Sequence, residues 1–493
     1  MKRVSIFIVT FVAMLLIACN GIETNILDSE SAAAKQKTST IIRDVNVSQN
    51  EAIEIANRFV RSNDDSGMLP TKSAFSSTKM IRSTETVSED GQNLMYVFNY
   101  QGGGFVIVGS TRNYYPILAY SDEGSFVLQD DMGPVDVWLD ETKVSVKNSN
   151  SLDNDTKAQM QNLWSMYDGT YADPAQEFFA ARRPHTRSTG EEACWEEIDA
   201  LQALYGDEGW TFLPVSAVED LFTDLGLSST YADICYSASQ NYSALNETVI
   251  GYRYPAINQV GPLLETEWHQ YAPFNNLCPN QYPAGSGVIA AAQVMKYYEE
   301  PDTLMLNNTT ITWADIPLSP NTTPNKIPQL ISRLGQVFYA NYGSSITITT
   351  PADVKAGLEY YDYQVDTNNN NAESTYRNWI FNYHRPVIMY GWKTSSLGSD
   401  TNLWVSDGVR QAVYNEIQFF TENQPNGAGT FTQGMYTYNN PGLAGQPVGN
   451  PIYTYHMNWG LQNGSYNGWF TSNYTYSAPL NYNYNKGSYG IHL

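Results

Sequence analysis

A serine at the start of the most apolar helical stretch is the first candidate for chemistry. Ser286 precedes residues 288–298, Val-Ile-Ala-Ala-Ala-Gln-Val-Met-Lys-Tyr-Tyr, which are apolar on most faces and predict a buried helix. A serine hydroxyl attacks a carbonyl only when a general base removes its proton. Residues 284–287, Ala-Gly-Ser-Gly, do not fit the Gly-x-Ser-x-Gly pattern of a nucleophile elbow. Ser286 is also a good N-cap, so its hydroxyl is expected to accept a first-turn N–H.

Cysteine and histidine are the other reactive residue types. Besides Cys19, the chain has Cys194, Cys235 and Cys278, an odd number that cannot pair completely within the chain. A Cys194–Cys235 disulfide is one open possibility. The cysteines form no CxxC motif and the five histidines are scattered, so the sequence predicts no metal site and no cofactor.

Strand-like runs follow the predicted helix at residues 387–392, 403–409, 453–459 and 469–471. Within residues 453–459, His456 and Asn458 are expected on one face of a strand. The other face is expected to carry Tyr453, Tyr455, Met457 and Trp459. A buried helix followed by an antiparallel sheet predicts an α+β domain over residues 251–493.

A smaller α+β unit is predicted within residues 20–135, after a polar tether. Ser48 and Glu51 have the spacing of a capping box and precede apolar residues at helical intervals. Two strand-like runs, 95–100 and 105–108, are separated by three glycines, which is typical of a hairpin. One helix packed on a small antiparallel sheet is the expected arrangement.

Residues 136–250 are interpreted as a partly helical connector. A basic cluster at residues 182–187 indicates either a protease-accessible segment or a solvated charge run. The total of 493 residues predicts two or three domains.

The N-terminus indicates export. Lys2 and Arg3 precede an apolar run, residues 4–18, that is too short for a confident membrane span and has the form of a signal peptide. The last four residues of segment 1–19, Leu-Ile-Ala-Cys, resemble a lipoprotein processing box, which implies lipidation of Cys19 and a location at the bacterial outer membrane or cell surface. An ordinary signal peptide with an incidental cysteine is the alternative.

The charge balance restricts the partners. Acidic residues number 50 and basic residues 27, for a formal net charge of −23, which excludes nucleic acid as an expected partner. Membrane contact is expected only through the lipid anchor.

Four segments, in this order, resemble the streptopain family of cysteine peptidases, family C10. They contain Gly-Pro-Leu-Leu with Trp-His-Gln and Pro-Phe-Asn (261–275), Ala-Gly-Ser with Ala-Gln-Val-Met-Lys-Tyr-Tyr (284–298), Arg-Pro-Val-Ile with Leu-Trp-Val-Ser-Asp-Gly (385–408), and His-Met-Asn-Trp-Gly (456–460). Gly-Gly-Phe-Val-Ile-Val and Ile-Leu-Ala-Tyr-Ser-Asp in the N-terminal unit resemble the inhibitory pro-domain of that family. The resemblance implies a papain-like C-terminal domain preceded by a small α+β pro-domain.

The resemblance also implies roles for single positions. The family has a nucleophilic cysteine at the start of the buried helix and a histidine base shortly before Asp-Gly, and here these positions hold Ser286 and Asn402. Gln270 matches the glutamine that helps to bind the oxyanion. Trp459, which follows Asn458, matches the tryptophan that covers the histidine side of the site.

These replacements predict a catalytically inactive pseudopeptidase. Asn402 has no basic lone pair at neutral pH, and loss of a general base typically lowers the rate by about 10²–10⁴-fold. The expected partner is a peptide or protein bound in the cleft, or a related peptidase inhibited by the N-terminal domain.

Two other interpretations remain open. In the first, the chain is an active peptidase with altered residues, which uses Ser286 with His456 as the base or, less simply, Cys278 as a displaced nucleophile. In the second, it is a surface adhesive or glycan-binding protein, as suggested by the Tyr- and Asn-rich tail at residues 453–489. Alternating Tyr and Asn also fit an exposed antiparallel strand.

Overall fold

The structure is a computed structural model, and the chain forms two compact units, residues 1–44 and 45–493. The elements below all lie in the second unit. Residues described are 44–63, 79–168, 198–203, 211–214, 219, 249–253, 258–306, 309–322, 325–392, 401–412, 416–426, 430–439, 452–472 and 485–493. Among them, no helix has the length and apolar character needed to cross a membrane.

Several predicted features lie outside the described residues. They are the signal peptide at 1–19 with Cys19, the tether, the basic cluster at 182–187, Cys194, Cys235 and residues 473–484 of the tyrosine-rich tail.

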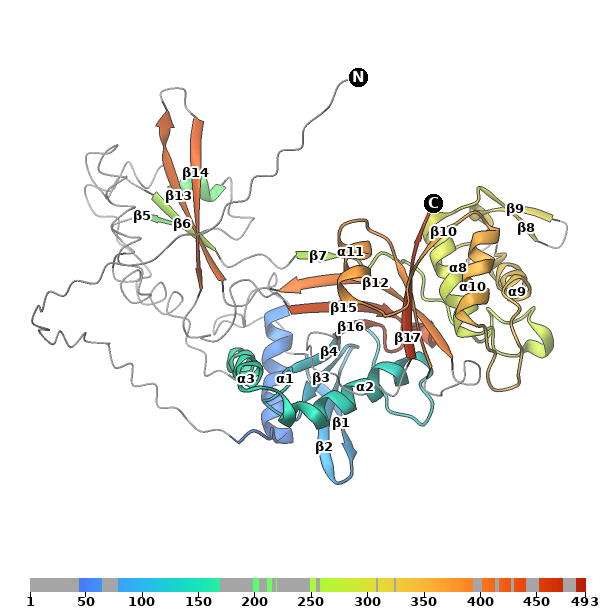
Figure 1. The fold of residues 1–493 in the computed structure, drawn as a ribbon, viewed down its shortest axis with the longest axis horizontal. Helices are drawn as coiled ribbons and strands as arrows, with labels where there is room; N and C mark the ends of the chain where they lie inside the picture. Colours follow the sequence, from blue (N-terminus) through green and yellow to red (C-terminus); the bar gives the residue numbers. More distant parts are fainter. Residues whose placement is uncertain are drawn as a thin grey trace, which may run out of the picture. The chain divides into compact units, whose positions relative to one another are not determined.

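One large antiparallel sheet connects the N-terminal and C-terminal parts of the described chain (Figure 1). Its eleven strands follow the order β1-β2-β3-β4-β16-β15-β12-β11-β17-β10, with β7 paired to β12. Strand β4 pairs with β16 through Ala119 opposite Phe470 and Tyr120 opposite Trp469. The strands are β1 (Ile81–Glu89), β2 (Gln92–Tyr100), β3 (Phe105–Gly109), β4 (Ile117–Ser121), β7 (Asn258–Val260), β10 (Gln364–Asn368), β11 (Val387–Trp392), β12 (Asn402–Ala412), β15 (Ile452–Asn458), β16 (Gly468–Thr471) and β17 (Asn485–His492).

The N-terminal part contains the predicted helix and hairpin. Helix α1 (Gln49–Asn63) follows the capping box, in which Glu51 Oε2 accepts from the backbone N–H of Ser48 at 2.8 Å and Ser48 Oγ accepts from that of Glu51 at 3.3 Å. The hairpin turn between β2 and β3 needs glycine, because a Cβ at Gly104 (φ 94°) would lie 2.8 Å from the carbonyl oxygen of Ser121.

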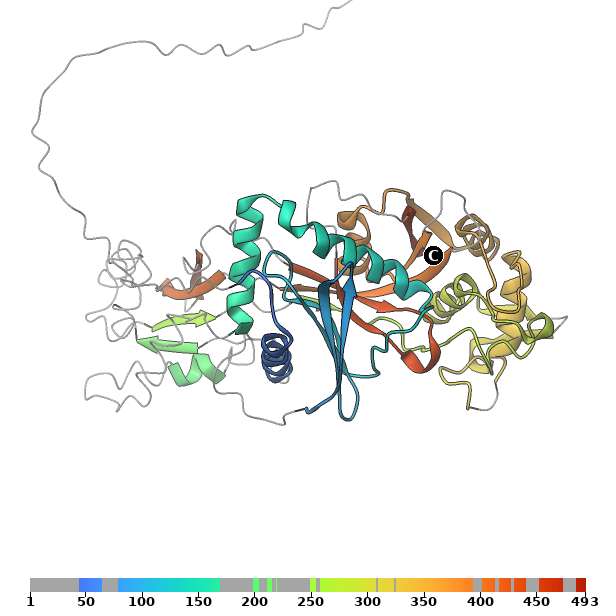
Figure 2. The same cartoon turned by 90° about the horizontal axis from the view of Figure 1, so that it is seen from below.

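Two more helices belong to this part, α2 (Pro134–Asn148) and α3 (Asn154–Asp168), with the short 3₁₀ helix η1 (Ser149–Ser151) between them. The domain boundary predicted at residue 135 therefore falls inside α2. Figure 2 shows α2 along one face of the sheet, where it contacts β2, β11 and β12. Its side chains Val135, Val137 and Leu139 are buried in the same apolar cluster as β2 and β3.

The C-terminal part is built around the predicted buried helix, α8 (Ser286–Tyr298), in which every residue from Ser286 to Met295 is buried. Helices α9 and α10 gather beside α8 at the end of the sheet near β10 and β17 (Figure 1). The remaining helices and turns are α9 (Ile327–Val337), α10 (Pro351–Tyr360), α11 (Glu373–Phe381), η5 (Pro279–Gln281), η6 (Trp313–Asp315) and η8 (Gln462–Gly464).

Two smaller sheets complete the described elements. A hairpin is formed by β8 (Thr303–Leu306) and β9 (Thr309–Thr312). A four-stranded sheet has the order β14-β13-β6-β5, with β5 (Thr211–Pro214), β6 (Val249–Arg253), β13 (Glu416–Asn426) and β14 (Thr430–Asn439).

Aromatic residues from both parts share one core. Trp138 of α2 contacts Phe470 of β16 with ring centres 4.8 Å apart, and Phe470 contacts Trp459 at 5.0 Å. Burying aromatic rings supplies much of the stability of such a core. The N-terminal part is therefore packed against the elements that carry the candidate site.

Candidate functional site

Ser286 lies at the N-terminal end of α8, and its hydroxyl is bound to the sheet. The backbone N–H of Leu403 on β12 donates to Ser286 Oγ at 3.1 Å. The N-cap is Gly285 (φ 96°), and Ser286 is the first helical residue. The expectation that Ser286 caps α8 is therefore wrong, because its hydroxyl accepts from a strand 117 residues later in the chain and not from the first turn.

Asn402 is the residue directly before Leu403, so the structure brings the predicted nucleophile and base positions together. It begins β12 and is half-buried, opposite Gly391 of β11. Its Oδ1 lies 3.8 Å from the point that a Cβ on Gly133 would occupy. Gly133 is the N-cap of α2, so the start of this pro-domain helix lies next to the base position.

Gln270 belongs to the loop that precedes α8. Its carbonyl oxygen accepts from the backbone N–H of Ala284 at 2.8 Å, two residues before Ser286. This bond holds the backbone of Gln270 beside the start of α8, and the oxyanion role of its side chain stays a prediction.

Asn458 and Gln293 form a buried amide pair behind the site. Gln293 Nε2 donates to Asn458 Oδ1 at 3.2 Å, and Gln293 Oε1 accepts from the backbone N–H of Trp268 at 3.0 Å. Asn458 Nδ2 donates to the carbonyl oxygen of Thr266 at 2.7 Å. Because both amides are occupied by neighbours, they join α8, β15 and the loop at 266–268.

Trp459 is buried at the end of β15. Its ring lies 5.5 Å from that of Trp404, two residues after Asn402. Its predicted role as the cover of the site stays a prediction.

His456 is not placed to serve Ser286. It lies opposite Gly408 of β12, whereas Ser286 is bound to Leu403, and five positions along a strand span about 16 Å. His456 Nδ1 lies 2.6 Å from Asp407 Oδ1, and Asp407 Oδ2 accepts from the backbone N–H of Leu264 at 3.0 Å.

Asp407 is fully buried and was not among the predicted site residues. The only available signal was its place in the Asp-Gly motif. The pairing of β12 with β15, which brings Asp407 to His456, cannot be read from either segment alone.

Cys278 lies in the apolar cluster around α8 and is a free thiol. Burial raises the pKa of this thiol, which is the opposite of what a nucleophilic cysteine needs. The environment of Cys278 therefore does not favour a displaced nucleophile.

His269 is buried next to Gln270, with its ring edge against Phe274 at 4.5 Å between ring centres. Burial lowers its pKa, so the neutral imidazole is favoured. Its Nδ1 accepts from the backbone N–H of Tyr271 at 3.3 Å. A neutral imidazole has one acceptor nitrogen, so this ring has none left to take a proton.

The described residues contain no evident set of side chains that could bind a metal ion. No group of three or more His, Cys, Asp or Glu side chains that could hold a metal ion occurs there. The site is thus a hydroxyl and a carboxamide at the junction of α8, β12 and α2.

A buried helix whose N-terminus meets an antiparallel sheet, preceded by a small α+β unit that extends this sheet, defines a papain-like fold with a pro-domain. Residues 268–470 match the family model of the peptidase C10 family, and residues 44–146 match that of the Spi protease inhibitor. The chain thus carries a C10-family peptidase domain behind an inhibitor-type pro-domain, which confirms the predicted family and fold class.

Two solved structures from Prevotella intermedia are similar to the chain. A fragment of prointerpain A, with an alanine in place of a cysteine, is 15% identical over 83% of this chain and 98% of that chain, with a TM-score of 0.44. Active wild-type interpain A cysteine protease is 22% identical over 43% of this chain and 86% of that chain, with a TM-score of 0.29. Among curated proteins, none matches significantly.

Proposed function

We propose that this chain is a catalytically inactive C10-family protein that acts by binding a peptide or protein. The observation that carries the proposal is the hydrogen bond from Leu403 to Ser286 Oγ, beside the carboxamide of Asn402. A serine hydroxyl needs a base to become a nucleophile, and an amide has no basic lone pair. The proposal includes export and lipidation at Cys19, for which residues 1–19 are the support.

The positions of the other histidines support inactivity. Of the four histidines in the described residues, His269 accepts from the Tyr271 N–H through Nδ1, and His456 Nδ1 lies against Asp407. His185 lies outside these residues. The carbonyl oxygens of His384 and Ile491 accept from the hydroxyls of Tyr297 and Tyr298, at the C-terminal end of α8. This end is about 16 Å from Ser286 along the helix axis. His384, and His492, which follows Ile491, are therefore remote from the Ser286 hydroxyl.

The contacts of α2 favour a pro-domain that stays in place over the site. Glu141 of α2 and Lys486 of β17 form a buried ion pair, with Lys486 Nζ 2.7 Å from Oε1 and 2.8 Å from Oε2. Burial raises the pKa of the Glu141 carboxyl and lowers that of the Lys486 ammonium, and the charge of each partner opposes this effect. Because α2 also begins beside Asn402, a ligand that reaches this position would have to displace α2.

Labelling with a serine-directed fluorophosphonate tests inactivity. We expect the full-length chain to show no more labelling than its Ser286→Ala variant, because no histidine of the described residues is placed to activate the hydroxyl. Labelling of the native chain that disappears in Ser286→Ala would refute the proposal. Metabolic labelling with a fatty acid, lost in Cys19→Ser and retained in the native chain, tests lipidation separately.

A second candidate function is inhibition of related peptidases, and the match of residues 44–146 to the Spi protease inhibitor favours it. The N-terminal part would have to leave its own C-terminal domain first. Titrating the full-length chain and its Glu141→Gln variant against an active C10 peptidase tests this. Stronger inhibition by Glu141→Gln than by the native chain supports trans-inhibition, and no inhibition by either chain argues against it.

A further inference from the structure

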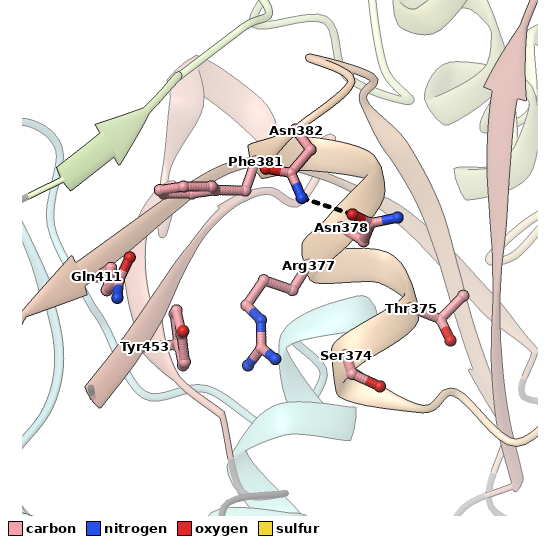
Figure 3. Close-up of a pocket in the computed structure, with 8 residues that line it drawn as sticks. All are labelled: Ser374, Thr375, Arg377, Asn378, Phe381, Asn382, Gln411 and Tyr453. Carbon is pink, nitrogen blue, oxygen red and sulfur yellow. Dashed lines mark hydrogen bonds between the residues drawn. The ribbon is translucent and has the colours of Figure 1, made fainter. Parts of the chain in front are cut away.

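A pocket of about 560 Å³ lies between α11 and the strands β12 and β15 (Figure 3). Its position on β12 is marked by Gln411, eight residues after Leu403, which corresponds to about 26 Å along the strand. The pocket is thus separate from the site at Ser286. The residues that shape it are Arg377, Asn378, Phe381, Asn382, Gln411 and Tyr453.

The pocket carries little net charge. Arg377 is its one ionisable basic residue among the lining side chains, and Arg377 Nη1 bonds both carboxylate oxygens of Glu373, at 2.6 and 2.9 Å. The hydroxyl of Tyr455 also donates to this carboxylate. Because Glu373 offsets the guanidinium, an anionic ligand gains little here. The lining has no carboxylate, so a cation lacks the charged ligands that bind it most strongly.

Three carboxamides line the pocket, together with the hydroxyls of Ser374 and Thr375. Asn382 Nδ2 donates to Asn378 Oδ1 at 2.6 Å, which fixes the two amides relative to each other. Gln411 faces them from β12 across the pocket in Figure 3. Each amide presents a donor and an acceptor in one plane, an arrangement that matches two neighbouring hydroxyl groups of a polyol.

Two aromatic residues supply apolar contact. Phe381 of α11 and Tyr453 of β15 both line the pocket, and the Arg377 guanidinium lies 4.1 Å from the centre of the Tyr453 ring. This cation–π contact holds Arg377 between α11 and the strand. Aromatic side chains beside planar amides suit a ligand that has both apolar C–H groups and hydroxyl groups.

We propose that this pocket binds a neutral carbohydrate, as the end or a short stretch of an oligosaccharide. Its volume is within the roughly 300–1,000 Å³ of small-molecule sites. The inference goes beyond the proposed function and does not rest on it, because the pocket lies away from Ser286 whether or not that site is active.

Isothermal titration of the full-length chain with maltotriose, mannotriose and triacetylchitotriose tests the proposal. We expect at least one sugar to bind, and Asn382→Ala and Gln411→Ala each to weaken that binding about tenfold, as expected for the loss of a ligand hydrogen bond. Asn321→Ala, the same change at an exposed asparagine outside the pocket, is the matched control and should bind as the native chain does.

Three results would overturn the proposal. The first is no binding of any of the three sugars at millimolar concentration. The second is binding that persists in both pocket variants, which would locate the sugar elsewhere. The third is binding of inorganic phosphate or an acidic peptide, lost in the same variants, in place of a sugar. Circular dichroism of each variant confirms that a lost signal reflects the pocket and not unfolding.

Discussion

The backbone N–H of Leu403 donates a hydrogen bond of 3.1 Å to the hydroxyl of Ser286. This bond joins the first residue of α8 to the strand that begins with Asn402, the two positions where C10 peptidases are expected to carry their reactive pair. The hydroxyl of Ser286 therefore makes a structural hydrogen bond at the junction of α8 and β12.

Replacing Ser286 with alanine should destabilise the fold. The change leaves the buried N–H of Leu403 without its acceptor, which is expected to lower the free energy of unfolding by about 1–3 kcal/mol. Urea denaturation of the full-length chain measures this loss. Ser344→Ala, at an exposed serine, is the control and should stay within about 0.5 kcal/mol of the native chain. Equal stability of the two variants would contradict the structural role of Ser286.

The Asp407–His456 pair is expected to act on stability alone. Asp407→Ala removes the partner of His456 Nδ1 and the acceptor of the Leu264 N–H, so we expect a loss of about 2–4 kcal/mol. His456→Ala should cost less, and the double variant less than the sum of the two single changes, because the residues share one interaction. Strictly additive losses in the denaturation series would show that the pair is not coupled.

The Glu141–Lys486 pair is expected to hold α2 against β17. Glu141→Gln or Lys486→Met alone leaves one buried charge unpaired and should cost about 3–5 kcal/mol, whereas Glu141→Met with Lys486→Met should recover most of this loss. Thermal unfolding measures these losses. The rate of limited proteolysis between residues 148 and 258 shows whether α2 stays packed against β17. A double variant as unstable as the worse single variant would be inconsistent with a coupled pair.

Stability should fall as the pH drops below the ordinary pKa of histidine, in part because of His269. Burial holds the pKa of His269 below its usual 6.5, so the unfolded chain binds a proton at a higher pH than the folded chain does. The contribution of His269 to the free energy of unfolding is complete above pH 6.5 and is lost as the pH falls through the lower pKa of the folded chain. His269→Gln should reduce the stability difference between roughly pH 7.5 and pH 5.5. An unchanged difference in His269→Gln would exclude this role.

The family and the papain-like fold could be predicted because their signals are local. The apolar run after Ser286, the Gly-rich hairpin and the Asp-Gly and Asn-Trp-Gly motifs each lie within a short stretch, and their order identifies the family. The same resemblance indicates Asn402 as the base position, and Asn402 precedes the residue that bonds Ser286.

What could not be predicted depends on pairing between distant segments. The acceptor role of Ser286 needs Leu403, the environment of His456 needs the register of β12 against β15, and the ion pair joins Glu141 to Lys486. Most of helix α2 falls in the predicted connector, residues 136–250, because polar residues dominate that part of the sequence. Its few apolar positions prove to be enough to pack against the sheet.

Hydrolysis of a fluorescent casein substrate by the full-length chain, beside its Ser286→Ala variant, tests the central claim most directly. Ser286→Cys combined with Asn402→His, assayed in parallel, restores the side chains of an active family member. We expect the native chain to release no more fluorescence than Ser286→Ala, because the structure places no histidine of the described residues beside Ser286. Turnover by the native chain that Ser286→Ala abolishes would contradict the account.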